Sequence, residues 1–185
     1  MKIKILGLLI ASLTVVAHAE LRTFQFIGTV TQSLPMAAAG TKVIGNFSYD
    51  TATKPLYAYS LSADGSSAAG YRIPRTFTLQ VNGHNLVSES IYVDIFDYVI
   101  GDVNDAISIY STPMTLDGTY YAEGAFGIFL NSAPGKTSVL RSTDLPRNIN
   151  ANQFNWQSYG VVQVNGGPSG ALLNFSIDRV KEIND

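Results

Sequence analysis

Four aspartates lie close together in the sequence and carry the clearest potential for chemistry. They are Asp94, Asp97, Asp102 and Asp105. Carboxylate oxygens gathered in a loop suit calcium, so these four would form a calcium site, although their spacing is not that of an EF-hand. Two of them facing one cleft would instead supply the carboxylate pair of a glycan-cleaving enzyme. The third alternative is an Asp-rich turn whose side chains cap their own backbone.

Aromatic residues form a second set of candidates, because rings on the outer face of a sheet can stack on the faces of sugars. The predicted ligand-binding residues are Trp156, Tyr159, Tyr120 and Tyr121. Around Trp156, amide side chains alternate with Phe154 and Trp156, and such amides would take sugar hydroxyls. The same alternation also allows Trp156 to face inward and to belong to the core.

The rest of the composition excludes several kinds of active site. The chain contains no cysteine, which excludes disulfides, zinc ribbons, thiol catalysis and iron–sulfur clusters. Of the two histidines, His18 lies in a segment that we expect to be cleaved, and His84 follows a predicted turn. One imidazole cannot build a histidine-based triad or a multi-histidine metal site. We therefore predict that the protein is not an enzyme, with no catalytic residue and with calcium as the one candidate cofactor.

The first 19 residues have the features of a secretory signal peptide. Lys2 and Lys4 supply the positive start, residues 5–16 are apolar, and a small-residue cleavage signal ends at Ala19. A membrane span needs about 20 apolar residues, and this stretch is shorter. We therefore expect cleavage near Ala19 and a periplasmic or extracellular destination, with residues 20–185 forming one domain that has no membrane span.

The overall composition is that of a folded domain and not of a disordered chain. Hydrophobic residues make up 46% of the sequence and charged residues only 14%, the reverse of what disordered segments show. The 12 basic residues are scattered and are outnumbered by 14 acidic ones, which argues against a nucleic-acid partner. A glycan or a neighbouring surface protein is the partner that we expect, and the oligomeric state stays open.

Apolar residues recur at every second position over most of the chain, which is the period of a strand with one buried face. This pattern predicts strands at residues 24–31, 42–49, 76–81, 84–90, 91–100, 106–111, 120–130, 160–164 and 171–180. Asn82-Gly83 predicts a two-residue hairpin between the third and fourth of them. The run at residues 91–100 is apolar on both faces, which favours a central strand.

Many short strands separated by turn residues, with no alternation of strands and helices, predict an all-β fold. We expect a single antiparallel β-sandwich of about eight to ten strands with jelly-roll or Greek-key connections. An up-and-down β-barrel is the alternative. Between Ser142 and Phe154 the sequence allows one or two helical turns, which Pro146 keeps short.

Several strand and turn segments resemble those of a loosely defined, largely uncharacterised group of exported bacterial β-sandwich proteins. Residues 26–30 and 40–50 resemble the opening hairpin of that group, and residues 102–111, 124–130 and 144–146 are similar to its later landmarks. Many members carry a C-terminal PEP-type sorting tail, whereas residues 176–185 contain neither its Pro-Glu-Pro element nor its hydrophobic segment and basic cluster. The resemblance implies export and a role in extracellular matrix or surface layers, and it implies no site residues.

These observations predict a non-enzymatic exported domain that binds a glycan or a protein in the extracellular matrix or at the cell surface. The alternative is a carboxylate-dependent glycan-active enzyme that uses acids from residues 94–105.

Overall fold

The computed structural model describes residues 20–61, 65–98, 104–136, 139–150, 152–154, 156–164 and 170–183. These residues form thirteen β-strands and no α-helix, so the all-β prediction is confirmed. The helical turns expected between Ser142 and Phe154 are wrong for the residues described there, which form bends and turns. Among the described residues, none belongs to a helix with the length and hydropathy that crossing a membrane would require. The predicted signal peptide lies outside the described residues.

The strands follow one another along the chain with short connections, except before β12. They are β1 (Leu21–Val30), β2 (Lys42–Asp50), β3 (Tyr57–Ser60), β4 (Ser67–Ile73), β5 (Phe77–Val81), β6 (His84–Ser88), β7 (Ile91–Asp97), β8 (Ala106–Ser111), β9 (Met114–Leu116), β10 (Thr119–Tyr121), β11 (Ala125–Asn131), β12 (Tyr159–Gln163) and β13 (Ala171–Glu182). The predicted hairpin at Asn82-Gly83 is confirmed, because both residues have positive φ angles, 48° and 82°, and Val81 pairs with His84.

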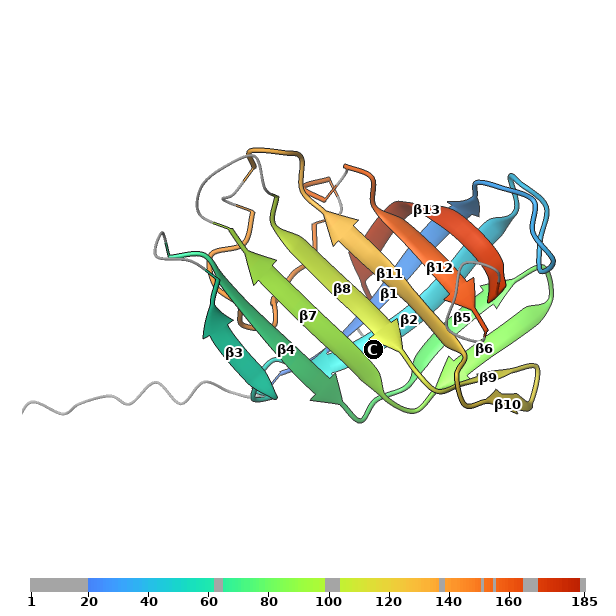
Figure 1. The fold of residues 1–185 in the computed structure, drawn as a ribbon, viewed down its shortest axis with the longest axis horizontal. Helices are drawn as coiled ribbons and strands as arrows, with labels where there is room; N and C mark the ends of the chain where they lie inside the picture. The colour runs from blue at the N-terminus through green and yellow to red at the C-terminus, as the bar shows by residue number, and fades with distance from the viewer. Residues whose placement is uncertain are drawn as a thin grey trace, which may run out of the picture.

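All thirteen strands belong to one antiparallel sheet, in the order β10-β9-β6-β5-β2-β1-β13-β12-β11-β8-β7-β4-β3. The sheet folds over on itself, so that β4, β7, β8, β11 and β12 lie in front of β1, β2, β5 and β6 (Figure 1). The long strand β13 joins the two layers, and its pairings with β1 and β12 both contain a register shift, the kind of bulge that bends a sheet. The predicted antiparallel sandwich is therefore present, built from one continuous sheet.

The two ends of the strand order are β10 and β3, which do not pair with each other, so the sheet is not closed into a barrel. Successive hairpins alternate between the layers: β1–β2 lies behind, β3–β4 in front, β5–β6 behind and β7–β8 in front (Figure 1). Each layer is completed by pairing between strands that are not consecutive in the sequence, such as β4 with β7 and β8 with β11.

The predicted strand number was too low, and the missed strands have a physical explanation. In β4 the residues of both faces are buried, so the alternation that marks a half-exposed strand is lost. Its outward positions Ala68 and Gly70 pair with Tyr59 and Tyr57 on β3, and the Tyr57 ring lies over Gly70. The predicted strand at residues 120–130 is divided in the structure, because β10 ends at Tyr121 and β11 begins at Ala125.

The core between the layers is rich in phenylalanine. Phe77 on β5 contacts the rings of Phe26 and Phe47 in its own layer and the ring of Phe126 in the other layer. The shortest of these contacts, between Phe77 and Phe126, has a centroid distance of 4.5 Å. Since the chain has no cysteine, stability has to come from this apolar burial.

The described residues between β11 and β12 form turns, bends and irregular structure, and they cover one end of the sandwich. Their side chains Leu140, Leu145 and Ile149 are buried and belong to the core cluster. Two core tyrosines anchor this segment: the Tyr49 hydroxyl donates to the Pro146 carbonyl at 2.7 Å, and the Tyr71 hydroxyl donates to the Thr143 carbonyl at 2.6 Å.

Candidate functional site

The described members of the predicted aspartate cluster point in different directions. Asp94 and Asp97 lie on the same strand, but the alternation of β7 puts Asp94 on the solvent face and Asp97 on the buried face. Asp105 is fully buried, and Asp102 lies outside the described residues. Since a retaining or inverting glycosidase needs two carboxylates facing one cleft, Asp94 and Asp97 do not supply that pair.

Asp105 has a structural role. One of its oxygens accepts the backbone N–H of Tyr98, and the other accepts those of Val139 and Leu140, at distances between 2.8 and 3.0 Å. Its carboxylate therefore ties the end of β7 to the segment that covers the end of the sandwich. This is the capping role expected of an aspartate in a turn, with donors that come from distant parts of the chain.

A metal site is not assembled by the residues that the structure describes. In those ranges no three histidine, aspartate or glutamate side chains lie together in a way that could hold an ion. Calcium at Asp94, Asp97, Asp102 and Asp105 thus remains a prediction from sequence, and the opposite orientations of Asp94 and Asp97 speak against a single site for all four.

Replacing Asp97 by asparagine is expected to stabilise the protein at about pH 7, and the gain should shrink as the pH falls to about 3. Burial first, and then the negative charge of Asp105, raise the pKa of Asp97 in the folded state. A carboxyl with a raised folded pKa favours folding most below its unfolded pKa, and this contribution is lost as the pH rises through the folded pKa. Asparagine stays uncharged at every pH, so the variant does not lose the free energy that burying a charged Asp97 costs the folded parent near pH 7.

Thermal unfolding of the parent and of Asp97→Asn at both pH values measures this effect. The melting temperature of the variant should exceed that of the parent near pH 7, and the two should converge near pH 3. A variant that melts below the parent near pH 7 would show that the Asp97 carboxylate makes a favourable interaction in the fold.

His84 begins β6 and lies at the surface, as the sequence indicated. Its Nδ1 atom is 2.6 Å from Asp117 Oδ2, and the other Asp117 oxygen accepts the Asn85 N–H at 2.8 Å. The hydrogen bond from His84 is the largest cause of the lowered pKa of Asp117. The pair joins the β5–β6 turn to the β9–β10 turn, and we assign it no chemistry.

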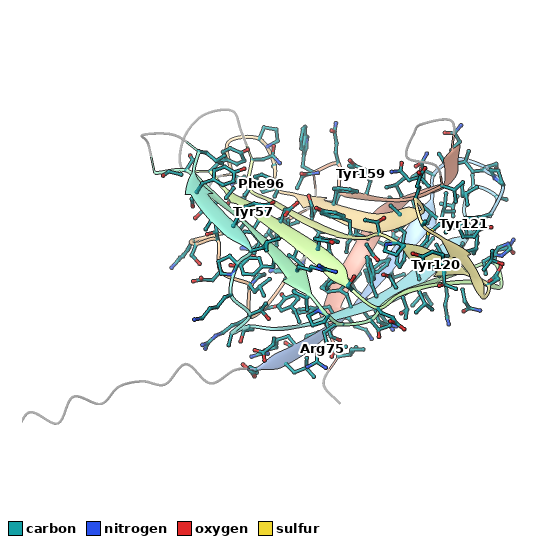
Figure 2. All side chains as sticks on the ribbon, turned by 60° about the horizontal axis from the view of Figure 1, so that its bottom comes forward. Tyr57, Arg75, Phe96, Tyr120, Tyr121 and Tyr159 are labelled. Atoms are coloured by element: carbon teal, nitrogen blue, oxygen red, sulfur yellow. The ribbon has the colours of Figure 1, made fainter. Side chains whose placement is uncertain are left out.

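The four predicted aromatic residues are not on one face. Tyr120 lies on the edge strand β10 and is 64% exposed, and Tyr121 beside it packs against the core. Tyr159 lies on β12, far from both (Figure 2). Trp156 precedes β12 and is 38% exposed, so it is not a core residue. Tyr120 and Tyr121 therefore lie on the edge strand β10, whereas Tyr159 lies on the interior strand β12.

The face to which Tyr159 belongs is more aromatic than the sequence analysis indicated. We call the solvent side of β3, β4, β7, β8, β11 and β12 the outer aromatic face. Its rings are Tyr57, Tyr59, Tyr92, Phe96, Tyr110, Phe129 and Tyr159. They form three stacked pairs, Tyr57 with Tyr59, Tyr92 with Tyr110, and Phe129 with Tyr159, with centroid distances between 4.9 and 5.9 Å.

Strand register arranges the residues of this face into two rows that run across the strands. The first row is Tyr57, Gly70, Asp94, Ser108, Phe129 and Tyr159. The second row is Arg72, Tyr92, Tyr110, Gly127 and Val161. With neighbouring strands about 4.8 Å apart, the first row crosses five intervals and is roughly 24 Å long.

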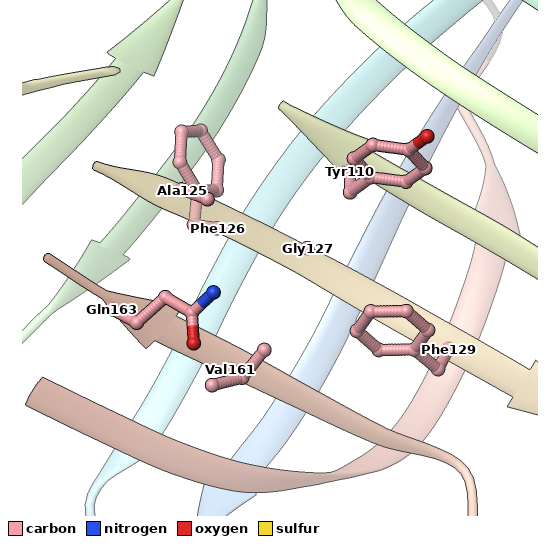
Figure 3. A pocket seen from close by; sticks show the side chains of 7 residues that line it. All are labelled: Tyr110, Ala125, Phe126, Gly127, Phe129, Val161 and Gln163. Atoms are coloured by element: carbon pink, nitrogen blue, oxygen red, sulfur yellow. The ribbon is translucent and has the colours of Figure 1, made fainter. Parts of the chain in front are cut away.

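A hollow lies in the second row, where Gly127 takes the place of a side chain. Tyr110 stacks on Tyr92 on one side, and its other neighbour in the row is Gly127, so that side of the ring is uncovered. The hollow measures about 190 Å³, and Tyr110, Phe129, Val161 and Gln163 surround it (Figure 3). A cavity of about 150 Å³ can hold benzene, so there is room here for one six-membered ring.

Asp94 and two tyrosine hydroxyls form a polar cluster near the middle of the face. The Tyr57 ring lies over Gly70, and its hydroxyl donates to Asp94 Oδ1 at 2.7 Å. This hydrogen bond is the largest cause of the raised pKa of Tyr57. Partial burial, and after it the nearby Asp94 carboxylate, raise the pKa of Tyr110 to about 12. Both phenols therefore stay protonated near neutral pH and serve as hydrogen-bond donors beside a carboxylate.

Sequence reasoning missed most of this face, although one signal was present. The run at residues 91–100 is apolar on both sides, which predicts a central strand, and β7 does lie inside the sheet. The second apolar side, with Tyr92 and Phe96, is however only half-buried and faces outward. An aromatic outer side on an interior strand was thus the available signal of a surface platform.

The chain matches no protein-family model, and neither curated proteins nor solved structures give a significant match.

Proposed function

We propose that this protein is a non-enzymatic exported domain that binds a glycan on its outer aromatic face, in the extracellular matrix or at the cell surface. The observation that carries the proposal is the hollow over Gly127, bounded by the uncovered side of Tyr110 and by Phe129. Sugar rings have apolar C–H faces that pack on aromatic rings, and their hydroxyls need polar groups at the edge. Gln163 supplies an amide at the rim of this hollow.

The size of the face favours a polymeric ligand. The first row, at roughly 24 Å, is several sugar rings long. It has aromatic pairs at both ends and polar side chains, Asp94 and Ser108, between them. An oligosaccharide lying across the strands would therefore stack at its ends and hydrogen-bond in the middle, while a single sugar would use only the hollow.

The arrangement of acids supports binding without cleavage. Among the described outward positions of the six strands, Asp94 is the one carboxylate. Glycoside hydrolysis by the usual route needs a second carboxylate within about 5 to 9.5 Å on the same cleft. A single acid held by tyrosine hydroxyls suits recognition better than proton transfer.

Affinity gel electrophoresis of the purified protein against a panel of soluble polysaccharides tests this function. We expect retardation by at least one polysaccharide, and we expect Tyr110→Ala to weaken that binding about tenfold, because one stacking surface is lost. Ile44→Ala is the control, since Ile44 is an exposed side chain of β2 in the other layer. Running the gels with and without calcium also tests the predicted metal.

Two outcomes would contradict the proposal. The first is the absence of retardation by every polysaccharide in both calcium conditions. The second is retardation that Tyr110→Ala leaves unchanged while Tyr120→Ala abolishes it, which would place the binding site at the edge strand β10 and not on the outer aromatic face.

A further inference from the structure

We propose that Asp94 is the hydroxyl-binding centre of the outer aromatic face and that it selects uncharged glycans over anionic ones. This inference rests on the proposed function and names the class of ligand. It follows from where Asp94 lies in the first row, from what its oxygens contact and from the absence of a compensating cation among its described contacts.

Asp94 lies in the middle of the face with small neighbours on both sides. Its partners in the first row are Gly70 on β4 and Ser108 on β8. Beyond them the row continues to Tyr57 on one side and to Phe129 on the other. A glycan stacked on the rings at both ends of the row would therefore pass directly over the Asp94 carboxylate.

The carboxylate has acceptor capacity left for a ligand. An ionised carboxylate offers about four lone-pair sites; the Tyr110 hydroxyl is one donor to it, and the Tyr57 hydroxyl occupies a site on Oδ1. This bond holds the carboxylate in a defined orientation, and adjacent sugar hydroxyls are donors that can bridge the two oxygens of one carboxylate. The Tyr57 oxygen can in turn accept a hydroxyl from the ligand, which would extend the same network.

The charge of Asp94 is not paired with a basic side chain in the part of the chain that the structure describes. The four ion pairs found there involve other residues. The basic residue of the neighbouring row, Arg72, has its guanidinium 5.9 Å from the centroid of the Tyr92 ring. The centre of the first row therefore carries the negative charge of Asp94, which no described ion pair neutralises; it accepts hydrogen bonds from hydroxyls and repels a carboxylate or sulfate group placed above it.

Affinity electrophoresis with matched neutral and anionic polymers tests this inference. Hydroxyethyl cellulose, galactomannan and xyloglucan are the neutral probes; carboxymethyl cellulose, pectate and dextran sulfate are the anionic ones. We expect the parent protein to bind the best neutral probe at least about fivefold more tightly than any anionic one, because like charges a few ångströms apart repel even near water. Asp94→Asn should weaken neutral binding about fivefold and should reduce the preference against anionic probes.

Two further variants separate charge from hydrogen bonding. Asp144→Asn removes an exposed carboxylate from the segment that covers the end of the sandwich and should leave both binding and preference unchanged, which controls for net charge. Tyr57→Phe removes the hydroxyl that donates to Asp94 but keeps the charge, so it should weaken neutral binding while the preference against anionic probes persists.

The possible failures are distinguishable. If the parent protein binds anionic probes as tightly as neutral ones, or if Asp94→Asn leaves the preference unchanged, the inference is wrong and the proposed function stands. If the parent protein binds none of the probes, the proposed function is overturned and the inference falls with it. Thermal melts of each variant establish that the fold is retained.

Discussion

Replacing Asp105 by alanine is expected to lower the free energy of unfolding by about 3 kcal/mol or more. The buried carboxylate accepts three backbone N–H groups, those of Tyr98, Val139 and Leu140. Alanine offers no acceptor, and each donor left unsatisfied in a buried site costs about 1–3 kcal/mol. Because the donors come from two parts of the chain, their loss would also weaken the attachment of the segment that covers the end of the sandwich, which the Tyr49 and Tyr71 hydroxyls would still hold.

Urea unfolding of the parent and the variant measures this loss. Asp144→Ala is the matched control, since it removes an exposed carboxylate that accepts a hydrogen bond from its neighbour Ser142, and its effect should stay within about 0.5 kcal/mol. Asp105→Asn should lie between the two, because the amide keeps one acceptor oxygen but turns an NH₂ group towards backbone donors. Equal stability of Asp105→Ala and Asp144→Ala would show that Asp105 does not organise this end of the molecule.

Replacing Phe77 by alanine is expected to cost about 3–5 kcal/mol. Phe77 is fully buried and is the ring through which the two layers meet, since it contacts Phe26 and Phe47 on one side and Phe126 on the other. Removing it leaves a cavity whose walls belong to different layers of a folded sheet, and such walls cannot collapse together without shifting strands. No disulfide holds the layers together in this cysteine-free chain.

Thermal and urea unfolding with Phe129→Ala as the control measure this effect. Phe129→Ala is the same substitution at a half-buried position of the outer aromatic face. It should therefore lower the free energy of unfolding by no more than about half as much as Phe77→Ala. A loss for Phe77→Ala that is no greater than the loss for Phe129→Ala would mean that the layers are not held together at this ring.

Aromatic rings pack over cross-strand glycines both in the core and on the outer aromatic face. Inside the sandwich the Phe26 ring lies against Gly45, its partner across the strands, and the Phe175 ring lies against Gly160. On the outside the Tyr57 ring lies over Gly70. A glycine opposite an aromatic residue lets the ring lie close to the backbone. Opposite Gly127, the ring of Tyr110 does not fill the space over the glycine, and a hollow is left there.

The sequence predicted the strands that have one apolar and one polar side. The alternation in β1, β2, β5 and β13 identified these strands, and Asn82-Gly83 located a hairpin. It did not predict β3 and β4, because two outward residues of β4, Ala68 and Gly70, are small and buried, and the Tyr57 ring of β3 lies over Gly70. Burial by a neighbouring strand is a tertiary effect, and no local pattern records it.

The candidate site could be predicted only in part. Tyr159 was among the predicted ligand-binding residues and does lie on the outer aromatic face. Tyr120 and Tyr121, equally aromatic in sequence, lie on β10 at the far edge of the sheet. Asp94 was singled out together with Asp97, yet one faces solvent and the other faces the core. Clustering along the sequence thus pointed to aromatic and carboxylate side chains, but it did not show which of them lie on the same face.

By itself the sequence determined the fold class, the absence of disulfides and which residues share a side within each strand, because the period of two is a property of the strand backbone. Only the tertiary structure decided which strands are neighbours. Tyr110 and Gly127 lie side by side because β8 pairs with β11, and Tyr57 reaches Asp94 because β4 lies between β3 and β7. These pairings bury one apolar core to which the thirteen-stranded sheet contributes as a whole. Which strands become neighbours therefore depends on the whole chain and not on any local pattern.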